Sequence, residues 1–183
     1  HLYGNGAYGI VPGYLDKYPY GYRPNGLYIP RFRNLHGQEA GLNFVRGYGY
    51  QGEALRPGWQ VLHKLTAGFG KDYKAALAGP GPWVLHLGGF GEMLPHADNR
   101  MSLHPTERDR YGIPLARFDV QFRDNENAMR ADIQREAAAM LTLAGAVGVT
   151  TYGGAQPGQS IHEMGTARMG RDPRTSFLNG WNQ

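Results

Sequence analysis

The residues best suited to chemistry lie near the end of the chain, in the segment SIHEMGTARMG at 160–170. His162 is the one side chain there that titrates near neutral pH, and a neutral imidazole can take a proton from a hydroxyl group. Small neighbours let a backbone approach a flat ligand closely. A single histidine beside glycines is also often a hydrogen-bonded structural residue, so composition alone leaves both roles open. The small neighbours are Gly165, Thr166, Ala167 and Gly170.

Two weaker candidates lie near residue 90. Glu92 follows Phe90-Gly91 at the end of an apolar run, where both side chains can face a substrate. A buried or capping carboxylate is the alternative for Glu92, and residue type favours that alternative.

The remaining patterns do not predict a metal or a phosphate site. Three histidines, His86, His96 and His104, are spaced by ten and eight residues without a cysteine partner, which is not a metal-ligand spacing. The letters of residues 4–9, GNGAYG, fit G-x-G-x-x-G. No β-branched strand precedes them and no helical pattern follows, so we do not expect a dinucleotide loop.

Composition bounds the class of protein. The 183 residues are enough for a domain with a hydrophobic core, with 41% apolar and 19% charged residues. There is no cysteine, which excludes disulfides and cysteine-based metal sites. The net charge is +4, but the arginines are scattered, so we expect no nucleic-acid surface. No apolar stretch reaches the length of a membrane helix.

The periodicities predict an α+β fold with a mainly antiparallel sheet backed by helices. Residues 116–122 alternate apolar and polar, which predicts a strand antiparallel to 100–104, with a charged loop at 105–111 and one face covered. Residues 83–88 predict a third strand of that sheet, stopped by Gly88-Gly89. Residues 126–144 predict a helix with an apolar stripe at Met129, Ile133, Ala137, Met140 and Ala144, a cap at Asp124 or Asn125, and a stop at Gly145.

Glycine-rich stretches predict loops elsewhere. Residues 1–60 are expected to be loop-rich, with short strands at 27–29, ended by Pro30, and at 43–50. Short helical turns are expected within 59–77, and a glycine-rich loop at 148–159. We expect one domain over 1–183, with a loop-rich part (1–80), a sheet and helix (81–160) and a final segment (160–183).

The spacing H-x-x-G-T-x-R-M-G from His162 to Gly170 resembles the C-terminal signature of the glucose–methanol–choline (GMC) flavoprotein oxidoreductases. Segments at 25–34, 44–52 and 89–95 resemble the bacterial sugar-oxidising branch of that family. The resemblance spans nearly the whole chain.

The resemblance implies the substrate domain of a two-domain enzyme that uses FAD. His162 would take the hydroxyl proton of an alcohol or sugar while hydride leaves for the flavin. Gly165 and Thr166 would lie near the flavin, and Phe90 and Glu92 near the substrate. Because the chain starts with His1 and lacks the glycine fingerprint, we expect an internal piece whose FAD domain is missing. A second catalytic His or Asn is expected beyond Gln183. The alternative is a non-catalytic carbohydrate-binding module with aromatic loops.

Overall fold

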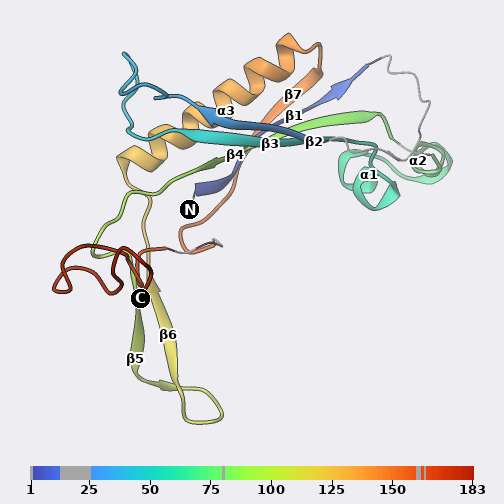
Figure 1. Ribbon diagram of the computed structural model, residues 1–183. Coiled ribbons are helices and arrows are strands. Elements are labelled where there is room, and N and C mark those ends of the chain that lie inside the picture. Colours follow the sequence, from blue (N-terminus) through green and yellow to red (C-terminus); the bar gives the residue numbers. More distant parts are fainter. Residues whose placement is uncertain (1, 13–25, 80, 160–161, 163) are drawn as a thin grey trace. The chain divides into compact units, whose positions relative to one another are not determined.

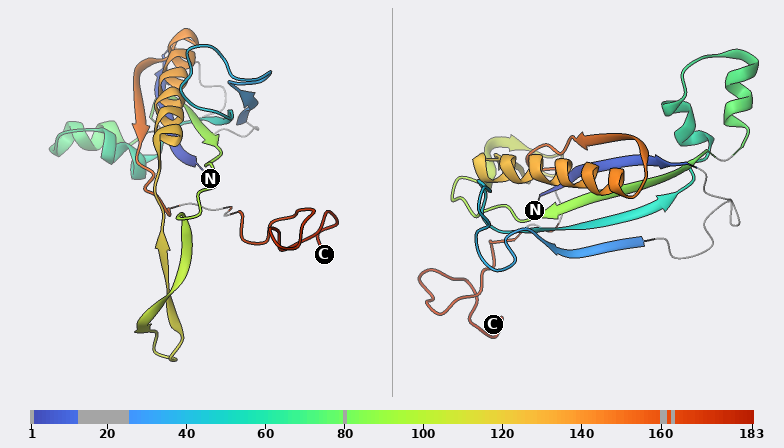
Figure 2. Two further views of the ribbon diagram at one scale, coloured as in Figure 1. Left: turned by 90° about the vertical axis from the view of Figure 1, so that its left-hand side faces the viewer. Right: turned by 90° about the horizontal axis from the view of Figure 1, so that it is seen from above.

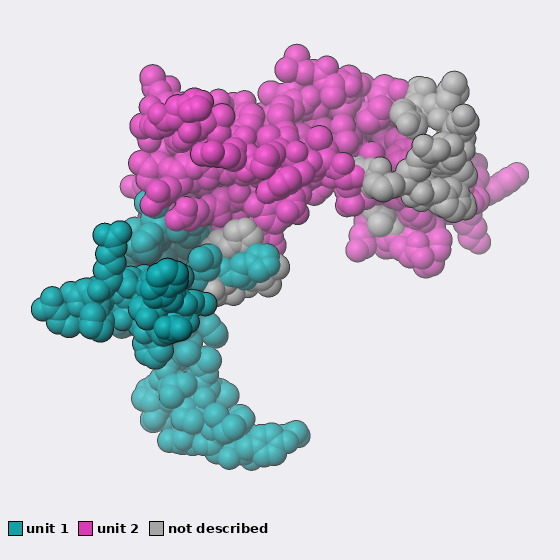
Figure 3. All heavy atoms as spheres, viewed as in Figure 1, with its two compact units in different colours: residues 1, 93–122, 156–183 teal, residues 2–92, 123–155 magenta. Residues whose placement is uncertain are grey.

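The chain divides into two compact units, which are coloured separately in Figure 3. Unit 1 comprises residues 93–122 and 156–183, and unit 2 comprises residues 2–92 and 123–155. The expectation of one domain over 1–183 stays a prediction. The computed structural model describes residues 2–12, 26–79, 81–159, 162 and 164–183.

Unit 2 is built on a five-stranded sheet in which every neighbouring pair is antiparallel, with the order β2-β3-β4-β1-β7 (Figure 1). The long helix α3 (Asp124–Leu143) runs along one face of this sheet, as the view from above in Figure 2 also shows. The α+β class predicted from the sequence is therefore confirmed. The strands are β1 (Leu2–Val11), β2 (Gly26–Phe32), β3 (Tyr48–Leu55), β4 (Trp83–Gly91) and β7 (Val147–Gly153).

Two glycines in β4 let α3 approach the sheet closely. A Cβ atom on Gly89 would lie 2.3 Å from Cγ2 of Ile133, and one on Gly91 would lie 2.5 Å from Sδ of Met129. Ile133 and Met129 are both completely buried. Glycine inside a strand usually marks such a close approach. The prediction that β4 stops at Gly88-Gly89 was wrong, because β4 continues to Gly91 and Gly89 serves helix packing rather than a turn.

Helix α3 confirms the predicted helix within two residues at each end. The predicted stripe is buried as far as Ala137, but Leu141 completes it, whereas Met140 is half-buried and Ala144 is exposed. Gly145 is the predicted stop, with φ 86° and an N–H that donates to the Thr142 carbonyl. Such a left-handed residue satisfies carbonyls that the last helical turn leaves unpaired.

The start of α3 differs from the prediction. The capping position is Arg123 rather than Asp124 or Asn125, and its backbone N–H donates to Oε2 of Glu126 at 2.9 Å. A glutamate three residues after the cap is the reciprocal half of a capping box. Glu126 is completely buried, which fixes where the helix begins.

A buried polar cluster ties α3 to the sheet and to the turn after β2. The side chain of Asp132 is only 2% exposed. Its carboxylate accepts hydrogen bonds from Nε of Arg33 at 2.9 Å and from the Tyr48 hydroxyl at 2.5 Å. Arg33 also pairs with Glu136, and the Tyr50 hydroxyl donates to the Ile133 carbonyl at 2.8 Å. Burial raises the pKa of Tyr48 far above its usual range and that of Tyr50 to about 12.

Strands β1 and β7 occupy segments that were predicted as loops, so those predictions were wrong. In β1, Gly6 and Gly9 have extended backbones, and a Cβ on Gly6 would lie 2.0 Å from the Leu87 carbonyl oxygen of β4. Gly4 alone in β1 has a positive φ, 75°, beside a register shift. Glycine at these positions lets a neighbouring strand or side chain come close to the backbone. Glycine is more often taken as a sign of a turn, so the sequence pattern did not indicate a strand.

Strands β2 and β3 confirm two predicted strands but shift their bounds. β2 continues through Pro30 to Phe32, which is tolerated because β2 is an edge strand and its proline need not donate to a neighbour. β3 begins five residues later than predicted, because Asn34 Nδ2 donates to the carbonyls of Phe44 and Arg46 and holds that stretch in a turn.

The residues predicted as short helical turns form α1 (Trp59–Leu65) and α2 (Gly70–Leu77). They are separated by Gly68, whose φ is 121°. This prediction is confirmed.

Unit 1 contains the hairpin of β5 (Arg100–Arg108) and β6 (Pro114–Asp119), which confirms the predicted antiparallel pair. It is a sheet of its own, so the prediction of one sheet shared with 83–88 was wrong. Most of the predicted 105–111 loop is strand, and Asp109 closes a shorter turn by accepting the N–H groups of Tyr111 and Ile113. Within the described residues, the apolar face is not covered as predicted, since Phe118 is 66% exposed.

Candidate functional site

The segment predicted to carry the chemistry lies, in its described residues, in unit 1, and residues 162 and 164–169 are exposed. His162 has φ 66°, a left-handed conformation that is uncommon outside glycine but enriched for histidine. Gly165 has φ 110°, and no heavy atom of the described residues outside its chain neighbours lies within 4 Å of the position its Cβ would take. Ser160, Ile161 and Glu163 fall outside the described residues. The backbone around His162 therefore has the special conformations that often accompany a functional position.

The second half of the motif is closed by backbone pairing. The Gly170 N–H donates to the Leu178 carbonyl at 2.8 Å, and the Leu178 N–H donates to the Arg168 carbonyl at 2.9 Å. A Cβ on Gly170 would lie 1.9 Å from Oγ of Ser176. The sequence suggested that Gly170 allows approach of a ligand, and the structure shows a contact within the chain that requires glycine there.

Asp172 organises the turn between these paired ends. Its carbonyl accepts the N–H groups of Thr175 and Ser176, and its carboxylate accepts Nη2 of Arg174 at 2.8 Å. The guanidinium of Arg174 lowers the pKa of Asp172, although both side chains lie in solvent. The loop from Arg168 to Leu178 is thus a small self-contained unit that follows His162.

The weaker candidates, Phe90 and Glu92, lie in unit 2 at the end of β4, whereas His162, Gly165 and Thr166 lie in unit 1. Phe90 is half-buried and pairs with Gly49. Glu92 is 57% exposed, with Oε2 3.8 Å from Nε of Arg46, so it is a surface ion pair. Such a pair contributes little to stability. Because most of the Glu92 side chain is exposed, its carboxylate is accessible to solvent.

The sheet of unit 2 presents a second polar surface that the sequence analysis missed. Strand register places its side chains in two rows on the face opposite α3, and we call this surface the open face. No helix among the described residues packs on it. One row contains Tyr28, Gln51, Gly88, Gly6 and Tyr152, and the other contains Gly26, Glu53, His86, Tyr8 and Thr150.

His86 and Tyr152 form a hydrogen-bonded pair on the open face. Nε2 of His86 contacts the Tyr152 hydroxyl, and the two rings stack with centroids 5.4 Å apart and 17° between planes. The Tyr152 hydroxyl lies 2.8 Å from where a Cβ of Gly6 would be and 3.0 Å from that of Gly88. Any side chain at these glycines would displace the tyrosine.

Partial burial keeps both members of this pair neutral. Burial lowers the pKa of His86, with the nearby carboxylate of Glu53 acting in the opposite direction. Burial also raises the pKa of Tyr152. A neutral imidazole and a neutral phenol can each donate and accept hydrogen bonds. The alternation of side chains between the two sheet faces within 83–91 and 147–153 could have indicated the His86–Tyr152 pair. That inference required residues 148–153 to be predicted as a strand.

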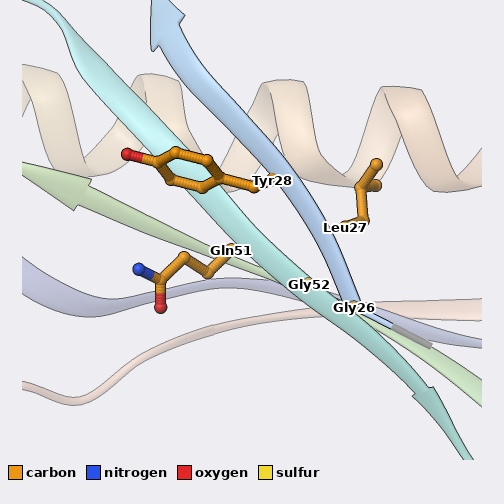
Figure 4. Close-up of a pocket in the computed structure, with 5 residues that line it drawn as sticks. All are labelled: Gly26, Leu27, Tyr28, Gln51 and Gly52. Carbon is orange, nitrogen blue, oxygen red and sulfur yellow. The ribbon is translucent and has the colours of Figure 1, made fainter. Parts of the chain in front are cut away.

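An open depression of about 360 Å³ lies at the β2–β3 edge of the sheet. Figure 4 shows the Tyr28 ring and the Gln51 amide extending to the same side from the two strands, while Leu27 points away. Tyr28 is 64% exposed. An exposed aromatic ring beside an amide is suited to a ligand with both apolar ring faces and hydroxyl groups.

The described residues do not fit the phosphates of a dinucleotide. Residues 4–9, which match G-x-G-x-x-G by letter, are part of β1 and pair with β4 and β7 instead of opening a helix. A phosphate cradle needs backbone N–H groups turned toward the ligand at a helix start. Among the described residues, the space left at Gly165 would admit a flat ring.

Among the described residues, no group of three His, Asp or Glu side chains is arranged to hold a metal ion. The helices of the described part of the chain include none that is long and apolar enough to cross a membrane.

Residues 95–183 match the family model described as GMC oxidoreductase. The chain is 39% identical over 95 residues to 2-methyl-1,2-propanediol dehydrogenase of Mycolicibacterium austroafricanum, an alignment that covers 51% of this chain and 17% of that protein. It is 29% identical over 127 residues to the gluconate 2-dehydrogenase flavoprotein of Pantoea cypripedii, covering 66% of this chain and 21% of that protein. The matches thus span about a fifth of these curated relatives.

Proposed function

Because residues 95–183 belong to the GMC oxidoreductase family, we propose that this chain is the substrate domain of an FAD-dependent enzyme that oxidises a CH–OH group of a sugar, polyol or other alcohol. The observation that carries the proposal is the position of His162 inside the matched region, on an exposed left-handed backbone followed by the open space at Gly165. The two relatives are named as dehydrogenases, and one is named as a flavoprotein.

In this proposal His162 is the general base. An alcohol becomes a hydride donor only as its hydroxyl proton is removed, and an imidazole about 3 Å from the oxygen can accept that proton. A flavin, when bound, supplies the acceptor for the hydride. Gly165 and Thr166 would leave room for the flat ring, and Phe90 and Glu92 would line the substrate side.

The FAD phosphates would be bound by a part of the enzyme other than the described residues. Residues 4–9 lie in a strand that pairs with β4 and β7 instead of at a helix start, so they do not form a phosphate cradle. The chain produced by itself is therefore expected to be colourless. A flavin absorption band that survives desalting would contradict this assignment of the cofactor site.

The test of His162 uses the complete flavoprotein that contains this chain. His162→Ala should slow flavin reduction by alcohol about 10²–10⁴-fold, the range for a lost acid–base group, with FAD still bound. Stopped-flow flavin absorbance measures this rate. His36→Ala is the matched control, because His36 is an exposed loop histidine in unit 2.

Two results would count against this role. A reduction rate that barely changes in His162→Ala would remove His162 from the mechanism. Loss of bound flavin in that variant would assign His162 a structural role.

A further inference from the structure

The connection between β3 and β4 is much longer than the sheet requires. The two strands are antiparallel neighbours, with Leu55 opposite Val84, and a short hairpin turn is enough to join such a pair. Residues 56–82 instead lead through α1 and α2, which lie together at one end of the sheet (Figure 1). Because strand pairing does not need this segment, its helices are candidates for a role of their own.

The two ends of the connection are held together beside the sheet. Nε of Arg56 donates to the Gly81 carbonyl at 2.7 Å, and the Gly81 N–H donates to the Pro57 carbonyl at 3.0 Å. Leu62 of α1 is buried, and a Cβ on Gly81 would lie 2.6 Å from its Cδ2. The helices are therefore carried on a closed stem that anchors α1.

Beyond this stem the helices have little packing of their own. α1 and α2 have seven and eight residues, and helices this short are marginal in water unless another surface packs on them. No residue of α2 is buried. Phe69, between the two helices, is 94% exposed, and Trp59 is 59% exposed. We call the exposed side chains of residues 59–77 the α1–α2 surface, and its aromatic rings indicate that it binds a partner.

The α1–α2 surface is basic, and its cations are lysines. The chain contains four lysines and fifteen arginines, yet residues 59–77 contain three of the lysines and no arginine. Lys64, Lys71 and Lys74 are all exposed. The segment has one acidic residue, Asp72, so three lysines minus one aspartate give a net charge of +2, half of the +4 of the whole chain.

This composition favours a lipid surface over a protein partner. Protein interfaces are enriched in arginine and depleted of lysine, which is the opposite of what residues 59–77 contain. At a lipid interface, Trp and Phe rings lie at the level of the headgroups, while a lysine places its aliphatic stem along apolar surface and its ammonium group among the phosphates.

We propose that the α1–α2 surface docks the protein on an anionic lipid bilayer. Trp59 and Phe69 leave water at the interface, and the three lysines are attracted to the charged headgroups. The bilayer supplies the packing surface that α2 lacks among the described residues. The proposal does not depend on the proposed function, because no residue of 59–77 takes part in the proposed oxidation.

Vesicle co-sedimentation of the full-length protein that contains this chain tests the proposal. Vesicles of phosphatidylcholine alone are compared with vesicles of phosphatidylcholine and phosphatidylglycerol in equal amounts, at about 0.1 M salt. Wild type should bind the anionic vesicles about 25-fold more strongly, because each unit of net charge contributes about fivefold. Lys71→Gln combined with Lys74→Gln should abolish this preference and leave binding to neutral vesicles unchanged.

The matched control for charge is Arg31→Gln combined with Arg46→Gln. It removes two exposed arginines where β2 ends and β3 begins, which is the end of the sheet away from α1. This control should bind the anionic vesicles as wild type does.

A further variant tests the apolar contact. Phe69→Ser should weaken binding to both kinds of vesicle about tenfold, because much of the phenylalanine side chain leaves water at the interface. Leu35→Ser is the matched control, since Leu35 is an exposed apolar residue in the loop after β2, and it should leave binding unchanged.

Four results would overturn the proposal. They are no binding of wild type to vesicles, equal binding to the two kinds of vesicle, a lysine variant that binds like wild type, and an arginine control that loses as much binding as the lysine variant. The first result would assign the α1–α2 surface to a protein partner, and the last would assign binding to overall charge. The measurement involves no turnover, so its outcome is independent of the proposed oxidoreductase activity.

Discussion

Adding one methyl group at Gly89 tests the packing of α3 on the sheet. In Gly89→Ala the new Cβ would lie 2.3 Å from Cγ2 of Ile133 and 3.0 Å from its Cγ1. Carbon atoms pack at about 3.5 Å or more, so Ile133 must withdraw by about 1.2 Å. β-Branched side chains are held in one main rotamer on a helix, so the backbone of α3 must move as well.

The expected cost is the upper part of the range for overpacking, about 2–3 kcal/mol of the free energy of unfolding. Equilibrium urea unfolding followed by circular dichroism measures this cost. Gly154→Ala is the matched control, because nothing in the part of the chain that the structure describes lies within 4 Å of its Cβ position, and its φ is not in the left-handed region. We expect that control to change stability by less than about 0.5 kcal/mol.

A second substitution shows whether the contact itself is responsible. Ile133→Ala alone should cost about 2–5 kcal/mol, because Ile133 is completely buried. Combined with Gly89→Ala, the loss should be smaller than the sum of the two single losses by about 1–3 kcal/mol, because the methyl enters the space that Ile133 vacates. Additive losses, or a Gly89→Ala protein as stable as the control, would refute the close packing of β4 against α3.

Three further predictions concern the polar cluster and the motif loop. Asp132→Ala should lower the free energy of unfolding by about 3–5 kcal/mol, because it leaves the buried Tyr48 hydroxyl and Arg33 without their shared acceptor. Asp132→Asn should lower it by less, and urea unfolding of the two variants measures the difference. The free energy of unfolding should fall as pH rises from about 10 to about 12, because tyrosine in the unfolded chain loses its proton near pH 10 while folded Tyr50 keeps its proton to about pH 12. Phenolate absorbance and urea unfolding at each pH measure this, and a free energy of unfolding that does not change over this pH range would contradict it. Gly170→Ala should open the 168–178 loop and speed hydrogen exchange of the Leu178 amide at least tenfold, about 1.4 kcal/mol of lost protection, and Gly170→Ala combined with Ser176→Gly should restore slow exchange.

Local patterns determined several parts of this protein from the sequence. The helix over 124–143 follows from apolar residues at a spacing of three and four, which a single buried face requires. The hairpin of β5 and β6 follows from the alternation at 116–122. The motif at His162 also depends only on residue types and spacing, and the match of residues 95–183 to the oxidoreductase family confirms the family it indicated.

Tertiary structure decided the role of the glycines. Gly6 and Gly9 lie in a stretch that was predicted as loop-rich, and Gly89 was predicted to stop a strand. Each lies in a strand where a neighbouring strand, helix or loop occupies the place of a side chain. Glycine is common in turns because it tolerates positive φ. The absence of a Cβ atom is equally useful where two elements pack in close contact. Nothing within a few residues of a glycine distinguishes these two uses.

The pairing of His86 with Tyr152 shows the same division. Sixty-six positions separate them, and neither has a local pattern that points to the other. They meet because β1 pairs with β4 on one side and with β7 on the other, which places both on one face across Gly6 and Gly88. The sequence determined which residue types were present and which segments were strongly periodic. The order of the strands decided which of them share a surface, because sheet register is set by pairings between segments that are distant along the chain.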